Sequence, residues 1–231
     1  LLSERQKILK RLGYSNVYVF DPTKEFLAMS EENFLEYIES LNPLAIVAGK
    51  DYTFGKMGRG NMTYLSKYMI NKGIRVVEVS LQKVNLRKIS TSQIKKLLSQ
   101  GQIEKANMLL GENYFIDGKV TKGRGVGARI GIPTANIIVS EMKHLPMEGV
   151  YKTQTEVEGI FYNSITNVGN HPTFEDNTFN IETMLIDKEI DLYDKDITVY
   201  FNGRIRDVIK FENPAQLVEQ IRSDIEKAYK K

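Results

Sequence analysis

A dense run of glycines, GRGVGARIGIPTAN at residues 123–136, has the composition of a loop that approaches a phosphate group. Glycine lets the backbone come close to a ligand, and successive backbone N–H groups can then face phosphate oxygens. Lys122, Arg124 and Arg129 surround the run with positive charge. On spacing alone, an ordinary structural turn with solvated basic residues stays open as the alternative.

Two better-known phosphate motifs do not explain this run. A Walker loop needs a lysine directly after its last glycine, and none follows here. Gly123, Gly125 and Ala128 match the dinucleotide fingerprint G-x-G-x-x-[GA], but that fingerprint must open a helix. Pro133 and the β-branched residues near it oppose a helix. The fingerprint match is therefore interpreted as accidental.

Thr134 and Asn136 follow the glycines at a spacing of two residues. In an extended segment, residues two apart point to the same side. A hydroxyl and an amide oxygen are suitable ligands for a hard cation, so the pair indicates a possible Mg²⁺ site.

Composition narrows the classes of function. The chain has 231 residues, enough for one large domain or two small ones, and a formal net charge of +3. It has no cysteine and two histidines, which excludes disulfides, thiolate catalysis and cysteine-ligated metal sites. No apolar run reaches the roughly 20 residues of a membrane helix. We expect a cytoplasmic protein with small-molecule substrates and no nucleic-acid or membrane partner, and we leave its oligomeric state open.

The first half alternates apolar runs with helical patterns. Residues 16–20, 44–49 and 74–80 are predicted strands, and Ser30 is a predicted helix N-cap between the first two. Strands that alternate with helices predict an α/β structure with a parallel sheet.

The second half changes to short strands without helices between them. Two helices, ending at Gly101 and Gly111, bridge the halves. The predicted strands follow at residues 113–120, 149–157, 161–168, 180–186 and 196–201. This pattern predicts an antiparallel barrel or sandwich, with an amphipathic helix at residues 213–231 packed against it.

Several segments of the second half resemble riboflavin kinases. Gly118 to Asn136 resembles the glycine-rich signature that ends in P-T-A-N. The resemblance continues in order through EGVY (148–151), NVGNHPTF (167–174), IETMLID (181–187), DLYDKDITVYF (191–201) and RIRDVIKF (204–211). In the first half, AGKDYTFGKMGRG (48–60) and KISTSQIKKLLSQGQIEKANMLLG (88–111) are similar to FMN adenylyltransferases. The chain thus resembles the bacterial bifunctional riboflavin kinase/FMN adenylyltransferase family, also called FAD synthetases.

The resemblance implies both a fold and two reactions. Residues 1–111 are expected to form an incomplete Rossmann-like α/β nucleotidyltransferase domain, whose H-x-G-H motif would lie upstream. Residues 112–231 are expected to form a six-stranded antiparallel barrel with a C-terminal helix. The reactions are the Mg²⁺-dependent phosphorylation of riboflavin by ATP to FMN and the adenylylation of FMN by ATP to FAD.

The resemblance also implies roles for individual residues. Glu182 is the expected catalytic base, Arg206 the flavin contact, and Thr134 and Asn136 the Mg²⁺ ligands. The expected ATP-binding residues are Gly123, Arg124, Gly125, Gly127 and Gly131 for the kinase step and Ser90, Thr91 and Ser92 for the adenylyl step.

The sequence departs from the family pattern at four positions of the kinase half. Val126 and Ala128 replace two arginines of the phosphate loop, Met184 replaces a histidine, and Val208 replaces a glutamate. Fewer cations near the phosphates should weaken ATP binding. Two alternatives therefore stay open: an enzyme that is mainly an FMN adenylyltransferase with a weakened kinase domain, and a non-catalytic flavin- or nucleotide-binding module.

Overall fold

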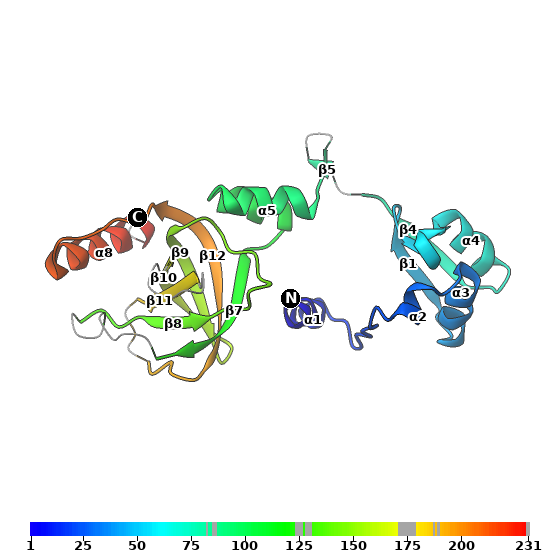
Figure 1. Cartoon of the computed structure of the whole chain (residues 1–231), viewed down its shortest axis with the longest axis horizontal. Helices are drawn as coiled ribbons and strands as arrows, with labels where there is room; N and C mark the ends of the chain where they lie inside the picture. The colour runs from blue at the N-terminus through cyan, green and yellow to red at the C-terminus, as the bar shows by residue number, and fades with distance from the viewer. Residues whose placement is uncertain are drawn as a thin grey trace. The chain divides into compact units, whose positions relative to one another are not determined.

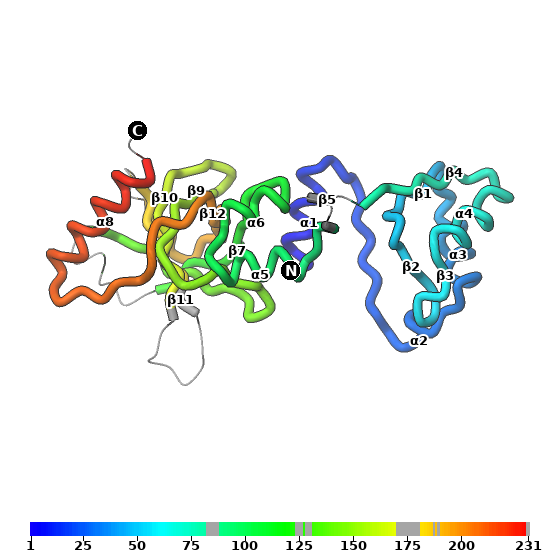
Figure 2. Tube along the Cα trace, turned by 90° about the horizontal axis from the view of Figure 1, so that it is seen from above, coloured from blue at the N-terminus to red at the C-terminus, as the bar shows by residue number. Residues whose placement is uncertain are grey.

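The computed structural model describes residues 1–81, 83–84, 87–122, 127, 131–170, 179–186, 188 and 190–229. The chain divides into two compact units (Figures 1 and 2). Gln6–Ile89 form the first, which we name the α/β unit. Leu1–Arg5 and Ser90–Lys231 form the second, which we name the barrel unit.

The α/β unit is built on a small parallel sheet of β1 (Ala45–Gly49) and β4 (Arg75–Val79). Its other elements are α1 (Leu2–Arg11), whose first residues belong to the barrel unit, α2 (Lys24–Leu27), α3 (Glu31–Ser40), β2 (Thr53–Phe54), η1 (Lys56–Gly58), β3 (Gly60–Asn61), α4 (Met62–Ile70), β5 (Lys83–Val84) and β6 (Arg87–Lys88).

Helix α3 begins where the sequence predicts it. The backbone N–H of Asn33 donates to the Ser30 hydroxyl at 3.1 Å, so Ser30 is the N-cap. Helices α3 and α4 then supply most of the buried core of this unit, which consists of Leu35, Phe54, Met62, Leu65 and Met69.

The predicted strand at residues 16–20 is wrong. This segment has no regular secondary structure, and Tyr18 is 71% exposed. Within the described residues, β1 and β4 pair only with each other, and residues 16–20 join neither edge of this sheet. The other two predicted strands are confirmed as β1 and β4.

The barrel unit contains a closed antiparallel barrel of six strands, as predicted. The strands are β7 (Tyr114–Thr121), β8 (Ala135–Ile138), β9 (Gly149–Val157), β10 (Ile160–Asn170), β11 (Phe179–Leu185) and β12 (Asp196–Arg206). Their order around the barrel is β10-β11-β8-β7-β12-β9. Helix α8 (Pro214–Tyr229) is the predicted C-terminal helix.

One polar cluster lies inside this barrel among apolar side chains such as Ile181 and Val199. The Thr153 hydroxyl oxygen lies 2.8 Å from the Ser164 hydroxyl and 2.8 Å from the Thr166 hydroxyl. Thr166 and Thr183 are 2.9 Å apart, and Thr155 and Ser164 are 2.8 Å apart. All five are at most 1% exposed. Because the hydroxyls bond to each other, none loses its hydrogen bonding on burial.

Helices α5 (Thr91–Ser99) and α6 (Ile103–Leu110) pack on the barrel. Asn107 makes this contact specific: it donates to the Phe201 carbonyl at 2.7 Å and accepts from the Tyr114 N–H at 2.8 Å. Both helices end as predicted, with Gly101 and Gly111 at positive φ. By their contacts the two helices belong to the barrel unit, which starts at Ser90 apart from Leu1–Arg5. The expected domain boundary between residues 111 and 112 stays a prediction.

A buried ion pair joins the first turn of α1 to the barrel. Lys143 Nζ lies 2.7 Å from Glu4 Oε1, and both side chains are less than 10% exposed. The same ammonium sits 4.4 Å from the centre of the Tyr114 ring. Burial lowers the pKa of Lys143, and the bond to Glu4 opposes that shift. Such a pair defines where the first turn of α1 lies more than it adds stability, because desolvating both charges offsets their attraction.

The described helices include none with the length and apolar character needed to cross a membrane.

Replacing Thr183 by valine tests the hydroxyl cluster. Valine has nearly the same shape, so the change removes one hydroxyl and leaves those of Thr166 and Thr155 with one partner fewer. We expect the free energy of opening at β10 and β11 to fall by about 1–3 kcal/mol, measured by native-state hydrogen exchange. Thr121→Val on β7 is the matched control and should cost less than about 0.5 kcal/mol. Equal effects of the two changes would contradict a special role for the cluster.

Candidate functional site

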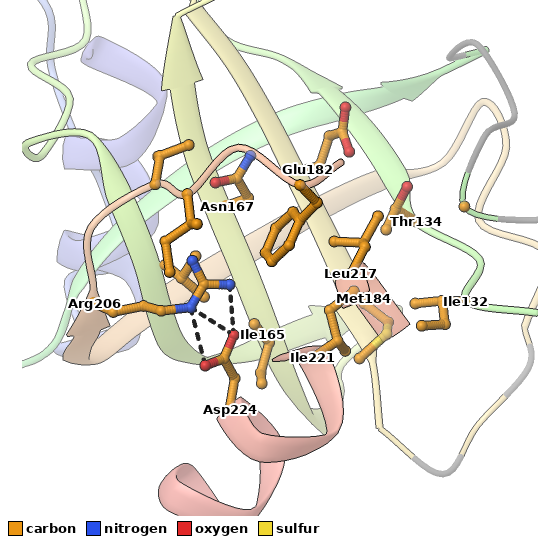
Figure 3. Close-up of a pocket in the computed structure, with 15 residues that line it drawn as sticks. Ile132, Thr134, Ile165, Asn167, Glu182, Met184, Arg206, Leu217, Ile221 and Asp224 are labelled. Atoms are coloured by element: carbon orange, nitrogen blue, oxygen red, sulfur yellow. Dashed lines mark hydrogen bonds and ion pairs between the residues drawn. The ribbon is translucent and has the colours of Figure 1, made fainter. Parts of the chain in front are cut away.

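A pocket of about 280 Å³ lies between the outer face of the barrel and helix α8 (Figure 3). Its walls are formed by strands β9 to β12, the segment before β8, the segment after β12, and residues 217–224 of α8. It is lined by Gly127, Ile132, Thr134, Val150, Ile165, Asn167, Glu182, Met184, Arg206, Val208, Ile209, Phe211, Leu217, Ile221 and Asp224.

Strand alternation explains which polar groups reach this pocket. Successive side chains of a strand point to opposite faces, so the residues beside the buried hydroxyls face outward. On β10, Thr166 points into the barrel and Asn167 lines the pocket. On β11, Thr183 points inward and Glu182 lines the pocket.

Glu182 lies in the middle of a row that crosses three strands. It pairs with Asn167 of β10 on one side and with Asn136 of β8 on the other. Directly paired residues in antiparallel strands have Cβ atoms about 4.5–5.5 Å apart, so the carboxylate has an amide side chain on each side. Thr134, two residues before Asn136, also lines the pocket. Figure 3 shows Thr134 and Glu182 on the opposite side of the pocket from Arg206 and Asp224.

Gly127 approaches the same segment so closely that no side chain would fit. A Cβ there would lie 2.3 Å from the carbonyl oxygen of Ile132 and 3.1 Å from the Thr134 hydroxyl. The Ile132 N–H donates to the Gly127 carbonyl at 2.8 Å. The glycine at this position therefore allows the backbone to pack beside Thr134.

The rest of the pocket wall is largely apolar. Met184 follows Glu182 by two residues and so shares its face of β11. Leu217 and Ile221 of α8 lie across from Ile165 of β10 (Figure 3). Such a lining, with a few polar groups at defined places, is typical of sites for small organic molecules.

Arg206, the last residue of β12, forms an ion pair with Asp224 of α8 (Figure 3). Its Nε lies 2.9 Å and its Nη2 2.7 Å from Asp224 Oδ2, and Nε also lies 3.0 Å from Oδ1. Gln220 donates to Oδ1 at 2.9 Å, and Arg206 Nη1 donates to the Asp207 carbonyl at 2.9 Å. Asp224 is fully buried.

The structure brings four of the predicted site residues to one pocket: Gly127, Thr134, Glu182 and Arg206. Asn136 does not line the pocket but stands next to Glu182 in the row. Gly131 is exposed, with a φ of 75° that favours glycine. Gly123, Arg124 and Gly125 lie outside the described residues.

Ser90, Thr91 and Ser92 lie at the start of α5 and do not line this pocket. The Ser90 hydroxyl accepts from the Gln93 N–H at 3.3 Å, so it caps the helix. Thr91 and Ser92 are exposed. Their role toward ATP stays a prediction.

Sequence reasoning did not single out Asn167 or Asp224. Asn167 stands in the NVGNHPTF segment, where its family resemblance was a usable signal. Asp224 is one acidic residue on an amphipathic helix, and nothing in the local pattern separates it from exposed neighbours such as Glu219.

The α/β unit presents an ion pair after its first strand. Lys88 of β6 bonds to Asp51, which follows the carboxyl end of β1. This hydrogen bond, although exposed, holds the pKa of Asp51 below its usual value. Ligands of parallel α/β sheets commonly bind at such strand ends. This loop is therefore a candidate for the nucleotide site that the sequence predicts for the adenylyl step.

Comparisons with known proteins match both parts of the chain. The riboflavin kinase family profile matches residues 110–231, and the FAD synthetase profile matches residues 1–93. The bifunctional riboflavin kinase/FMN adenylyltransferase of Bacillus subtilis is 36% identical, with 98% of this chain and 73% of that protein covered. The protein of the same description from Listeria monocytogenes is 32% identical, with 96% and 71% covered.

A solved structure agrees over nearly the whole chain. The crystal structure described as a macrolide-efflux protein from Streptococcus pneumoniae has a TM-score of 0.87 and 32% sequence identity, with 99% of this chain and 74% of that chain covered. That description belongs to the S. pneumoniae protein, and the likeness here concerns the fold. By the matched profiles and by its identity to the curated relatives, this chain belongs to the bifunctional riboflavin kinase/FMN adenylyltransferase family.

Proposed function

We propose that the chain phosphorylates riboflavin with ATP in the pocket beneath α8, and that its α/β unit takes part in adenylylating FMN to FAD. The observation that carries the kinase assignment is the paired row Asn167–Glu182–Asn136, of which Asn167 and Glu182 line the pocket together with Thr134. Apart from Arg206 and Asp224, the rest of the lining is apolar. This arrangement combines a base and oxygen donors with a slot for an aromatic ring system.

In the kinase step, the terminal hydroxyl of the ribityl chain attacks the γ-phosphorus of ATP. A new O–P bond forms as the bond to the bridging oxygen of ADP breaks, and the hydroxyl proton passes to a base. Glu182 is the carboxylate in the pocket wall nearest to Thr134, which supports its assignment as that base. Asn136 and Asn167 flank it and can orient the carboxylate or the attacking hydroxyl.

Phosphoryl transfer depends mainly on position and charge neutralisation. The tight approach of Gly127 to Thr134 supports a backbone cradle for the phosphates at this side of the pocket. Gly123, Arg124, Gly125 and Gly131 are proposed to extend this cradle, and Arg124 supplies its positive charge.

The residues present fit a Mg²⁺ ion that is shared with the nucleotide. Thr134 and Asn136 offer a hydroxyl and an amide oxygen on one side of β8, and Mg²⁺ prefers such hard oxygen donors. Within the described part of the chain, no three His, Asp or Glu side chains gather as a metal-binding group. The protein would thus contribute few ligands, and phosphate oxygens and water would complete the set, as is usual for Mg²⁺. When bound, the ion would neutralise charge on the transferred phosphoryl group.

For the adenylyl step, the phosphate of FMN attacks the α-phosphorus of ATP and pyrophosphate leaves. Ser90, Thr91 and Ser92 are proposed to meet nucleotide phosphates at the start of α5, where backbone N–H groups are available. A cytoplasmic location, expected from the cysteine-free sequence, fits an enzyme of cofactor synthesis.

The alternative, an FMN adenylyltransferase with a weakened kinase domain, rests on four departures from the family pattern. These are Val126, Ala128, Met184 and Val208. Production of FMN from riboflavin and of FAD from FMN, each measured separately with ATP and Mg²⁺, distinguishes it. FAD formation without FMN formation would favour that alternative. Riboflavin binding without either product would favour the non-catalytic module.

Replacing Glu182 by glutamine removes the proposed base and keeps the shape of the side chain. We expect the turnover of riboflavin to FMN to fall by about 100-fold or more, with riboflavin affinity changed little. Separation of the flavin products gives the rate, and fluorescence titration gives the affinity. Glu158→Gln, at an exposed turn of the same barrel, is the control and should keep the wild-type rate. A fully active Glu182→Gln enzyme would remove this residue from the role of base.

Replacing Thr134 by valine removes one proposed Mg²⁺ ligand. We expect the Mg²⁺ concentration for half-maximal FMN formation to rise about tenfold, equivalent to about 1.4 kcal/mol of lost binding. The rate measured against Mg²⁺ at saturating ATP tests this. Thr63→Val, on the exposed face of α4, is the matched control. An unchanged Mg²⁺ profile for Thr134→Val would contradict the ligand assignment.

A further inference from the structure

We propose that Asp224 is a positioning residue for flavin binding: it holds the guanidinium of Arg206 in one orientation and cancels its charge, so that Arg206 can donate to an uncharged acceptor of the flavin ring. This inference rests on the proposed riboflavin kinase function. It concerns a residue on the C-terminal helix that has no part in the reaction chemistry itself.

The contacts of Arg206 fix its side chain from two directions. Asp224 accepts from Nε and Nη2, with three N–O distances of 2.7–3.0 Å. The Asp207 carbonyl accepts from Nη1 at 2.9 Å. Gln220, one turn before Asp224 on α8, donates to the same carboxylate at 2.9 Å and fixes its orientation in turn. The guanidinium plane therefore has little freedom to rotate.

This arrangement leaves donors for a ligand. A guanidinium has five N–H groups. The contacts with described residues use the Nε–H, one N–H of Nη2 and one of Nη1, which leaves one N–H on each terminal nitrogen. Because Arg206 lines the pocket, a bound molecule can accept these bonds.

Charge decides which kind of acceptor fits. The Asp224 side chain is 1% exposed and that of Arg206 is 16% exposed, so the pair is shielded from water. A buried arginine without its carboxylate would favour an anion, whereas the neutral pair has no net charge to offer a phosphate. A carbonyl oxygen of the flavin ring matches two N–H donors without net charge. The phosphates are then expected at the other side of the pocket, near Gly127 and Thr134.

The same ion pair also fixes the apolar wall. Leu217 and Ile221 lie seven and three residues before Asp224 on α8, so they share its face of the helix and line the pocket with it. A second anchor lies at the end of α8, where the Tyr229 hydroxyl donates to the Ser164 carbonyl at 2.9 Å. Asp224 thus connects the position of the ring-binding wall to the orientation of Arg206.

Asp224→Asn tests the inference in the 231-residue chain, because asparagine keeps the size but removes the charge and one acceptor. We expect the dissociation constant of riboflavin and its KM to rise about tenfold, as for the loss of one charge-assisted hydrogen bond, while the KM for ATP stays unchanged. Gln220→Ala, a milder change of the same network, should raise the riboflavin KM about threefold. Glu219→Gln, an exposed acid on the same helix, is the control and should match the wild type.

A double-mutant cycle separates positioning from a merely structural role. If Asp224 acts through Arg206, Asp224→Asn should cause no further loss of riboflavin affinity in an Arg206→Gln background. A loss that persists in that background would overturn the inference, and so would wild-type riboflavin binding by both Asp224→Asn and Gln220→Ala. Either result leaves the proposed function standing. A wild-type chain that neither binds nor phosphorylates riboflavin would overturn the proposed function and this inference together.

Discussion

Mutual hydrogen bonding among buried hydroxyls is the constraint on which the barrel depends. Thr153, Thr155, Ser164, Thr166 and Thr183 are almost fully buried and bond to each other across β9, β10 and β11. A buried hydroxyl without a partner costs about 1–3 kcal/mol. Sliding one strand by one residue would turn these groups out of the barrel and bring polar outer side chains in. The cluster therefore specifies one register for three neighbouring strands.

That register is also the one that assembles the pocket. Because side chains alternate along a strand, the neighbours of Thr166 and Thr183 must face outward. These neighbours are Asn167 and Glu182, and they are directly paired. The outer face of a small barrel is open to solvent unless another element covers it. Helix α8 covers part of it here and is attached through Asp224 and Tyr229, so that Asn167 and Glu182 line a pocket.

Two of the four departures from the family pattern, Met184 and Val208, line this pocket. Met184 extends the apolar wall next to Glu182, where a histidine would add a polar group. Val208 lies on the segment after β12 and is 46% exposed, so it borders the pocket opening. Neither position contributes charge, and the cationic side chain in the described pocket lining is Arg206, which Asp224 neutralises.

The sequence by itself determined most of the local structure: the strand periodicity, the Ser30 cap and the glycine ends of α5 and α6 depend on neighbours along the chain. The spacing of Thr134 and Asn136 indicated these two residues directly, and Glu182 was indicated by the family resemblance of its segment. Sequence reasoning failed for residues 16–20, where an apolar run has no partner strand, and it did not single out the four-residue strand β8, which is too short for a periodic pattern. Only the tertiary structure placed Asn167 beside Glu182 and Asp224 against Arg206, because strand register and helix docking join residues that are distant in the chain and carry no local signal of their contact.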